Sequence, residues 1–156
     1  TDIGIGANEF KEREEVRNYL DQLQTVVEAY VEKYPYCNRN NPWGILEPFN
    51  IQYYKPTEGF YVWHCERTGI EHPFGSRHMV FMTYLNNVFD QGETEFYYQK
   101  SKISPQRGLT LIWPADWTFT HKGCPSNTQE KYIVTGWVNY QLPYASNPKA
   151  KKGIEF

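Results

Sequence analysis

The sequence predicts a mainly β fold, a sandwich or jelly roll, with one helix near the N-terminus. Two patterns carry this prediction: apolar residues three and four positions apart early in the chain, then short apolar segments separated by turn signals. Aromatic residues make up 17% of the 156 residues, and aromatic side chains are enriched in strands. We expect one domain over residues 1–156, with a helical part at 8–34 and a β core at 49–141.

One amphipathic helix is predicted over residues 8–34. Charged residues occupy one face, and the apolar residues of the other face are Val16, Leu20, Leu23, Val27, Tyr30 and Tyr34. Pro35 ends the helix, because the proline ring disfavours the helical conformation of the residue before it. An apolar stripe on one helix of this length usually packs on the protein's own sheet rather than on a partner. Residues 35–50 are rich in Asn, Pro and Gly and are predicted to form a loop.

Six short strands are predicted in the β core. They cover residues 50–55, 59–65, 78–86, 94–98, 108–113 and 131–141, with turn-forming residues between them. Regular spacing of this kind is typical of a sandwich or jelly roll. The tail after Pro143 carries Lys149, Lys151 and Lys152 and is expected to be a solvated end.

Charge, cysteine content and hydropathy bear on the partners and the compartment that we expect for this protein. The net charge is −2 from 16 basic and 18 acidic residues without a basic stripe, so we expect no nucleic-acid partner. Cys37, Cys65 and Cys124 have no metal-type spacing, and their odd number argues against a disulfide framework, which favours a reducing, cytoplasmic compartment. There is no apolar run near 18 residues and no signal peptide, so no membrane segment is expected.

The triplet His64-Cys65-Glu66 and the more distant His121 form the candidate metal site. Two imidazoles and one carboxylate make a facial triad that holds Fe(II) at three positions and leaves three open. An H-x-E triplet alone is a weak signal, because a solvated strand readily carries one. The other two histidines, His72 and His78, are expected in a loop and at a strand start, and would substitute as ligands if the strand register is different.

Lys131 is the candidate anion anchor. A period of two places Lys131, Ile133, Thr135 and Trp137 on one face of the last strand, and both faces of this strand are largely apolar. An unpaired buried charge is costly, and the strand carries no acid, so the carboxylate of a ligand would serve as the partner. The alternative is that Lys131 extends out to solvent at the strand start.

From residue 50 to residue 140 the chain resembles the prolyl 4-hydroxylase branch of the Fe(II)/2-oxoglutarate dioxygenases. The similarity rests on Tyr54 ten residues before the His64 triplet, on the aromatic strand and Gly-containing turn at 81–96, and on His121-Lys122-Gly123-Cys124-Pro125 leading to Lys131 and Trp137. It implies a double-stranded β-helix, a cupin-like jelly roll. Residues 1–48 contain no matching motif.

The resemblance also implies a role for each matching residue. His64, Glu66 and His121 would bind iron and form the catalytic centre. Lys131 would pair with the distal carboxylate of 2-oxoglutarate, with assistance from Tyr84 and Thr135, while Tyr54 and Thr94 would line the same pocket. Arg77 and Trp137 would face the substrate, although Tyr84 and Trp137 also suit an aromatic core. The family usually has Asp where this chain has Glu66, and the extra methylene shifts the ligand oxygen.

The implied activity is hydroxylation that consumes O2 and 2-oxoglutarate and releases succinate and CO2, with ascorbate as a candidate additional cofactor. A peptidyl proline is the expected substrate, and a free amino acid or other small molecule near Trp63, Trp113 and Trp117 is the alternative. Two further classes stay open: a jelly-roll binding module without redox activity, and a cupin-type isomerase or other metalloenzyme that does not use 2-oxoglutarate. The sequence does not predict the oligomeric state.

Overall fold

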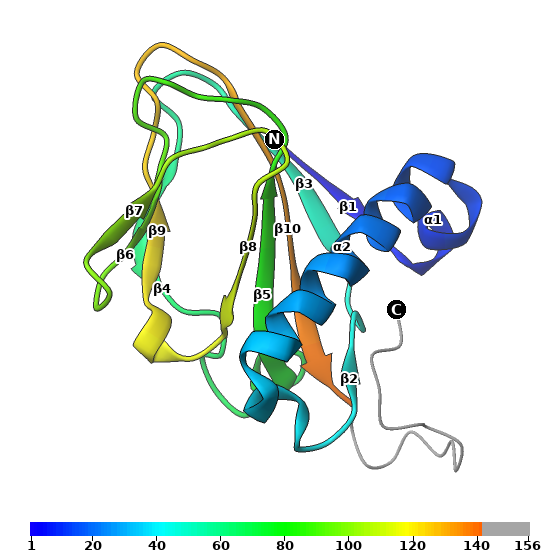
Figure 1. The fold of residues 1–156 in the computed structure, drawn as a ribbon. Coiled ribbons are helices and arrows are strands. Elements are labelled where there is room, and N and C mark those ends of the chain that lie inside the picture. The colour runs from blue at the N-terminus through cyan, green and yellow to red at the C-terminus, as the bar shows by residue number, and fades with distance from the viewer. Residues whose placement is uncertain (142–156) are drawn as a thin grey trace.

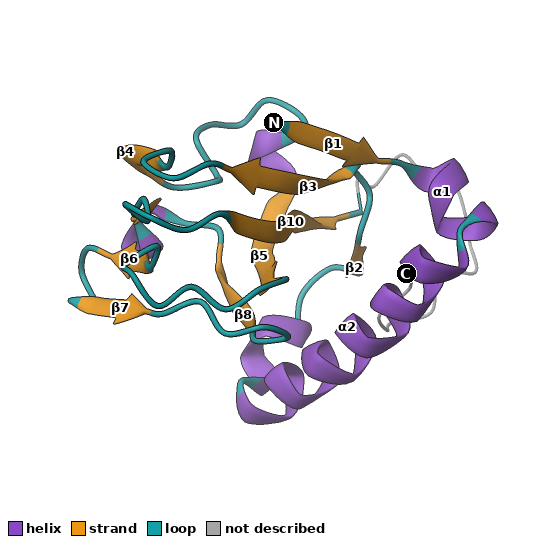
Figure 2. Cartoon of the chain, turned by 90° about the horizontal axis from the view of Figure 1, so that it is seen from above, coloured by secondary structure: helices purple, strands orange, loops and turns teal. Residues whose placement is uncertain are grey.

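The computed structural model describes residues 1–141 as two antiparallel β-sheets and a helical layer. The smaller sheet, the larger sheet and the helices follow one another as three layers in both views (Figure 1, Figure 2). The prediction of a mainly β fold is therefore confirmed, and the two-sheet arrangement is that of a jelly roll. The tail predicted to be solvated, with Lys149, Lys151 and Lys152, lies outside the described residues.

The larger sheet has six strands. Its order is β1 (Asp2–Ile5), β3 (Phe49–Tyr54), β10 (Lys131–Tyr140), β5 (Arg77–Tyr84) and β8 (Thr110–Pro114), and β2 (Trp43–Gly44) pairs with the end of β10. The smaller sheet has the order β4 (Phe60–His64), β9 (His121–Gly123), β6 (Thr94–Phe96) and β7 (Ser101–Ile103). Three short 3-10 helices, η1 (Pro35–Asn38), η2 (Phe74–Ser76) and η3 (Trp117–Phe119), lie in the connections.

The N-terminal helix is broken where the sequence predicted one continuous helix. Helix α1 (Ala7–Glu12) and helix α2 (Glu14–Lys33) meet at Arg13, whose backbone is extended with φ −102° and ψ 119°. The apolar stripe of α2 begins at Val16. Helix α1 has no fully buried residue and contacts the same core through Phe10, whose ring stacks on Phe49 with centroids 5.3 Å apart. Among the described residues, no helix is both long and apolar enough to span a membrane.

Helix α2 covers the outer face of the larger sheet, as its stripe predicted. Its buried residues Val16, Leu20, Leu23 and Val27 belong to the core that includes Phe49, Met79, Phe81, Val134 and Val138 of the sheet. Burying an aliphatic side chain of this size stabilises a fold by roughly 1.5–3 kcal/mol. The stripe therefore fixes the helix to the face of the sheet that points away from the smaller sheet.

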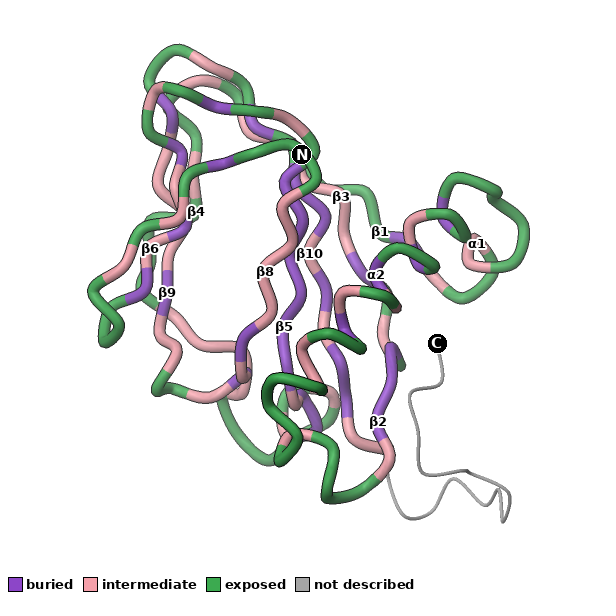
Figure 3. Tube along the Cα trace, viewed as in Figure 1, coloured by how far each residue is buried: buried purple, intermediate pink, exposed green. Residues whose placement is uncertain are grey.

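Strand β5 is buried along nearly its whole length, as Figure 3 shows by its purple trace. Met79 and Phe81 point towards α2, while Val80, Met82 and Tyr84 belong to a second apolar cluster between the sheets. This alternation follows from the period of two in a strand. The second cluster lines the space where the predicted site residues lie.

Candidate active site

The β4–β9 pair brings the two predicted histidine ligands together. His64 ends β4 and lies opposite His121, the first residue of β9, and their ring centroids are 4.3 Å apart. Glu66 follows in the loop after β4. The backbone N–H groups of Glu66 and Arg67 both donate to the carbonyl oxygen of Ala115, at 3.1 and 2.9 Å, which fixes this loop next to the sheet.

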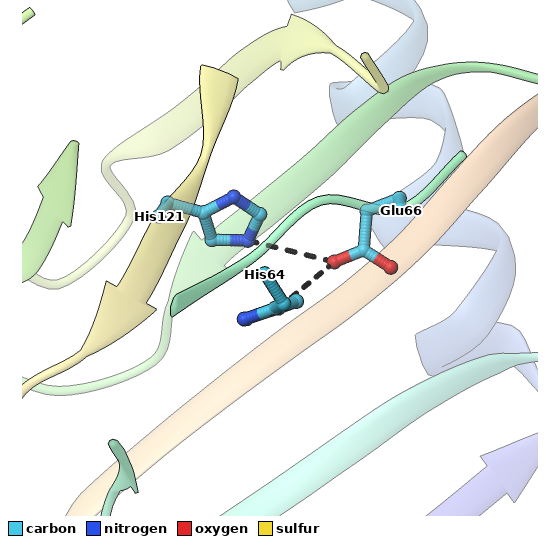
Figure 4. Close-up of side chains that lie close together, drawn as sticks. All are labelled: His64, Glu66 and His121. Atoms are coloured by element: carbon cyan, nitrogen blue, oxygen red, sulfur yellow. Dashed lines mark ion pairs between the residues drawn. The ribbon is translucent and has the colours of Figure 1, made fainter. Parts of the chain in front are cut away.

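One oxygen of Glu66 faces both imidazoles. Its Oε1 lies 3.2 Å from His64 Nε2 and 3.5 Å from His121 Nε2, and the three candidate ligand atoms lie within 4.8 Å of one another (Figure 4). The opposite ring nitrogens, Nδ1, donate to the carbonyl oxygens of Val62 and Phe119, each at 2.9 Å. A neutral histidine that donates through Nδ1 presents the lone pair of Nε2 to a metal. This donor set fits a divalent iron ion.

The triad carboxylate is ionised near neutral pH. Burial alone would raise the pKa of Glu66, but hydrogen bonds with His121 and His64, and their charges, hold it well below its usual range. Burial likewise opposes the charged form of His64, yet the neighbouring Glu66 raises the pKa of this imidazole overall. A metal requires a deprotonated carboxylate, so the environment of Glu66 suits ligation.

The second oxygen of Glu66 is held by the larger sheet. Oε2 accepts a hydrogen bond from Trp137 Nε1 at 2.8 Å and one from Arg77 Nη1 at 3.3 Å. Arg77 also donates through Nε and Nη2 to the two carboxylate oxygens of Glu47, each at 2.9 Å. The guanidinium carbon of Arg77 lies 3.7 Å from the centroid of the Trp137 ring.

The structure places Arg77, one of the two residues predicted to face the substrate, beside Glu47 and Glu66. Arg77 is 7% exposed and does not line the cavity, because its donors serve Glu47 and Glu66 behind the triad. Trp137, the other predicted substrate residue, does line the cavity beside the triad.

A cavity of about 240 Å³ extends from the triad between the two sheets. Trp137 and Lys131 lie on the same face of β10, six positions apart, so the cavity follows this strand. All five residues predicted for 2-oxoglutarate line it: Tyr54, Tyr84, Thr94, Lys131 and Thr135. The sequence thus selected residues that the fold brings into one space, although they come from four different strands.

Lys131 points into the structure instead of extending out to solvent. It is 4% exposed, and its Nζ donates to the carbonyl oxygens of Gly92 at 3.0 Å and Cys124 at 2.8 Å. Within residues 1–141, no acid forms an ion pair with it. Burial lowers the pKa of Lys131 to about 8. An ammonium group has three donors, so one remains for an anion in the cavity.

Two tyrosine hydroxyls stand near the Lys131 end. Tyr84 Oη lies 2.6 Å from Thr94 Oγ1 and donates to the carbonyl oxygen of Ile103 at 3.0 Å. Tyr54 Oη donates to Gln52 Oε1 at 2.9 Å. Burial raises the pKa of both tyrosines to about 12, so both remain protonated donors.

Sequence reasoning missed two residues of this region. Gln52 lines the cavity on the same face of β3 as Tyr54, and strand alternation would have found it. Glu47 lies in the loop between β2 and β3, within the part of the chain that carries no motif, so nothing in the sequence linked it to Arg77.

The structure also places the histidine, cysteine and tryptophan residues that were considered beside the main candidates. His78 Nε2 lies 2.8 Å from the carbonyl oxygen of Cys37, and in the described part of the chain only His64, Glu66 and His121 gather as a metal-type group. Burial raises the pKa of Cys65 and Cys124, so both remain thiols near neutral pH. Of the three tryptophans considered for a small-molecule pocket, Trp113 lines the cavity, whereas Trp63 and Trp117 do not.

Two antiparallel sheets around a His-Glu-His triad define the class of mononuclear iron oxygenases built on a jelly roll. A family model described as the 2OG-Fe(II) oxygenase superfamily matches residues 49–139, more than half of the chain. The chain belongs to this superfamily. It is an oxygenase that depends on Fe(II) and uses 2-oxoglutarate and O2 as co-substrates, which disfavours the binding module and the metalloenzyme without 2-oxoglutarate.

Solved structures of prolyl hydroxylases share the fold. The viral collagen prolyl hydroxylase of Paramecium Bursaria Chlorella virus-1, in its 2OG complex, aligns with a TM-score of 0.68 at 20% identity and covers 90% of this chain and 79% of its own. A prolyl-4-hydroxylase of Pseudomonas putida aligns with a TM-score of 0.67 at 17% identity, covering 90% and 72%.

A third similar structure is a prolyl hydroxylase of Trichoplax adhaerens in complex with a peptide fragment of the hypoxia inducible factor oxygen degradation domain. It has a TM-score of 0.64 at 20% identity, and the alignment covers 89% of this chain and 62% of that one. No curated protein matches the sequence. At these identities the similarity establishes the fold.

Proposed function

We propose that His64, Glu66 and His121 hold the Fe(II) and that Lys131 binds the distal carboxylate of 2-oxoglutarate. The observation that carries this proposal is one cavity with the triad and the single buried ammonium group among its lining residues. When bound, iron and 2-oxoglutarate supply the oxidising chemistry that inserts one oxygen atom into a substrate and yields succinate and CO2. The protein contributes binding, orientation and exclusion of water.

The residues around Lys131 support this assignment. Two backbone carbonyls direct its Nζ and leave one donor for a carboxylate. Tyr54, Tyr84 and Thr94 add neutral hydroxyl groups to the same cavity, and each tyrosine would donate to an anion there once its O–H turned away from Gln52 or from the carbonyl oxygen of Ile103. Thr135, between Lys131 and Trp137 on the same strand face, is assigned to the middle of the co-substrate.

A peptidyl proline is the substrate that we propose. The cavity of about 240 Å³ is smaller than the roughly 300–1,000 Å³ typical of pockets for drug-sized ligands, so a further substrate has to reach it from the mouth. Phe60 lines the cavity while 49% exposed, and the indole of Trp137 lies beside the triad. Proline rings pack well on such aromatic surfaces, and the three similar solved structures are prolyl hydroxylases.

A free amino acid remains the second candidate substrate, because Trp113 also lines the cavity and offers an apolar wall.

Ascorbate is proposed as an agent that keeps the iron reduced. The three free thiols, Cys37, Cys65 and Cys124, favour a reducing, cytoplasmic compartment.

The test is incubation of the iron-loaded enzyme with 2-oxoglutarate, with and without ascorbate, and with proline-containing peptides or free amino acids. We expect succinate and a mass gain of about 16 Da on the peptide, the mass of one inserted oxygen atom. His121→Ala serves as the inactive control. A gain on small molecules alone would remove the peptide proposal, and absence of succinate in every mixture would contradict the assignment of the site.

A further inference from the structure

We infer that Trp137 and Arg77, held in place by Glu47, are positioning residues that direct Glu66 to the metal through Oε1 alone. This inference rests on the metal site proposed above and extends it to residues outside the triad. It also explains how this chain uses a glutamate where the family usually has an aspartate.

The two oxygens of Glu66 have separate partners. Oε1 faces the Nε2 atoms of His64 and His121, while Oε2 accepts hydrogen bonds from Trp137 Nε1 at 2.8 Å and from Arg77 Nη1 at 3.3 Å. An ionised carboxylate has about four lone-pair sites, two on each oxygen. The two donors therefore occupy Oε2, and Oε1 keeps its lone pairs for an ion between the imidazoles.

The length of the glutamate side chain matters for this division. Glu66 extends from a loop after β4 to Trp137 on the opposite sheet, and an aspartate is shorter by one carbon–carbon bond, about 1.5 Å. The loop cannot readily follow, because the N–H groups of Glu66 and Arg67 are fixed to the carbonyl oxygen of Ala115. An aspartate here would therefore lose either the bond to Trp137 or its place between the imidazoles.

Glu47 fixes Arg77 in turn. The two side chains form a bidentate ion pair at 2.9 Å, with side-chain exposures of 12% for Glu47 and 8% for Arg77, and Asn139 Nδ2 donates to Glu47 Oε1 at 3.1 Å. Planar, bidentate pairing of this kind fixes the orientation of the guanidinium. The guanidinium stacks on the indole of Trp137, so it also orients the ring whose N–H bonds Glu66.

Glu47 also balances charge. Without it, the buried guanidinium of Arg77 would have Glu66 as its remaining ionic partner and would compete with the metal for that carboxylate. Glu47 lies two residues before the segment that the family model matches, so this contribution comes from a part of the chain outside the shared motif. Glu66, Arg77 and Trp137 lie within the matched segment.

The experiment measures Mn(II) affinity by calorimetry, and the Mn(II) electron paramagnetic resonance spectrum, in the full chain. Trp137→Phe removes the N–H donor and retains an aromatic ring beside Arg77. Loss of a residue that orients a metal ligand typically weakens metal binding about 10- to 100-fold, and we expect a loss in this range together with a changed spectrum. Trp43→Phe is the matched control, because Trp43 is a buried indole in the core under α2 whose Nε1 has no hydrogen-bond partner. Its metal affinity should equal that of the unsubstituted protein.

A second comparison separates positioning from general packing. Glu66→Asp should weaken Mn(II) binding in the unsubstituted background and add little further loss in Trp137→Phe, because after either change the carboxylate no longer bonds Trp137 and lies between the imidazoles at the same time. Glu47→Gln, which is isosteric, should also weaken Mn(II) binding and provides the same test if Trp137→Phe does not fold.

The outcomes distinguish failure of the positioning roles from failure of the proposed metal site. If the unsubstituted protein binds Mn(II) and both Trp137→Phe and Glu47→Gln bind it equally well with unchanged spectra, the positioning roles are wrong and the triad stands. Full additivity of Glu66→Asp and Trp137→Phe would also contradict them. If the unsubstituted protein does not bind Mn(II), the proposed metal site fails and the inference with it.

Discussion

Raising the pH from 7 to 9 should weaken 2-oxoglutarate binding about tenfold, through loss of the proton from Lys131. Burial lowers the pKa of this lysine to about 8, and the smaller influences of Cys124 and Glu93, which raise it, do not compensate. The distal carboxylate binds the charged form, so binding above the pKa of the free enzyme first requires protonation. At pH 9 about one molecule in ten carries the proton, and each further pH unit adds roughly 1.4 kcal/mol.

The assay is anaerobic calorimetry of 2-oxoglutarate binding to the Mn(II)-loaded protein in two buffers with different ionisation enthalpies. Proton uptake per bound 2-oxoglutarate should be near zero at pH 7 and approach one at pH 9, since the ligand restores the charged form. Lys131→Arg is the matched control, because an arginine stays protonated over this range. It should bind 2-oxoglutarate more weakly than lysine, since the planar group needs more room, but with the same affinity at both pH values.

Two results would refute this reasoning. The first is unchanged affinity from pH 7 to 9 without proton uptake in the unsubstituted protein, which would mean that Lys131 is not the titrating anchor. The second is an equal pH dependence in Lys131→Arg, which would assign the titration to another group.

The same buried lysine makes the stability of the ligand-free protein depend on pH. Its pKa in the folded state, about 8, lies below the ordinary value of 10.5, so between these values the unfolded chain binds more protons than the folded one. The contribution of Lys131 to the free energy of unfolding should therefore rise with pH from about 8 to 10.5, by up to about 3 kcal/mol. Urea denaturation of the unsubstituted protein and Lys131→Met across this range measures the difference.

Four further substitutions test the site and its support. His64→Ala or His121→Ala should abolish measurable Mn(II) binding in calorimetry, because two ligands do not hold a labile divalent ion tightly, and unchanged affinity in both would refute the triad. Lys131→Ala should weaken 2-oxoglutarate binding by about 2–5 kcal/mol, the range for removing one partner of a buried charge pair, while Mn(II) affinity stays intact. Gly136→Ala should destabilise the fold by about 1–3 kcal/mol in urea denaturation. A Cβ at Gly136 would collide with the ring of Phe81 and come within 2.5 Å of Phe49 Cβ, so an unchanged midpoint would show that the core there yields easily.

Periodic patterns in the sequence predicted the elements that keep one face against the core or the cavity along their length. The stripe from Val16 to Val27 places α2 on the larger sheet, and alternation in the last strand puts Lys131 and Trp137 on the cavity face. The break at Arg13 was not predicted, because the residues on both sides of it are good helix formers and no proline or glycine marks it.

The short strands and the role of Arg77 could not be predicted in the same way. Strands β1 and β9 have four and three residues, which is too few for a sequence pattern. Strand β1 is held by its hydrogen bonds to β3, and strand β9 by its hydrogen bonds to β4 and β6. Arg77 was expected at the substrate because its position in the chain matches the family. Its partner Glu47 is 30 residues away and lies in a loop, so the ion pair that turns Arg77 inward has no local signal.

Strand β10 relates the two halves of the proposed site to each other. The cavity face of this strand carries Lys131, Ile133, Thr135 and Trp137. The spacing between Lys131 and Trp137, whose indole N–H bonds Glu66, is therefore set by the rise of a strand, about 3.3 Å per residue. The same strand pairs with β3 and β5 on its two sides and packs Val134 and Val138 into the core under α2. A co-substrate that bridged Lys131 and a metal at the proposed triad would have to match the distance from this strand to His64 and His121 on the smaller sheet. In the proposed site we therefore expect the spacing between β10 and the smaller sheet to select a dicarboxylate of the length of 2-oxoglutarate, while the loop after β4 sets the place of Glu66.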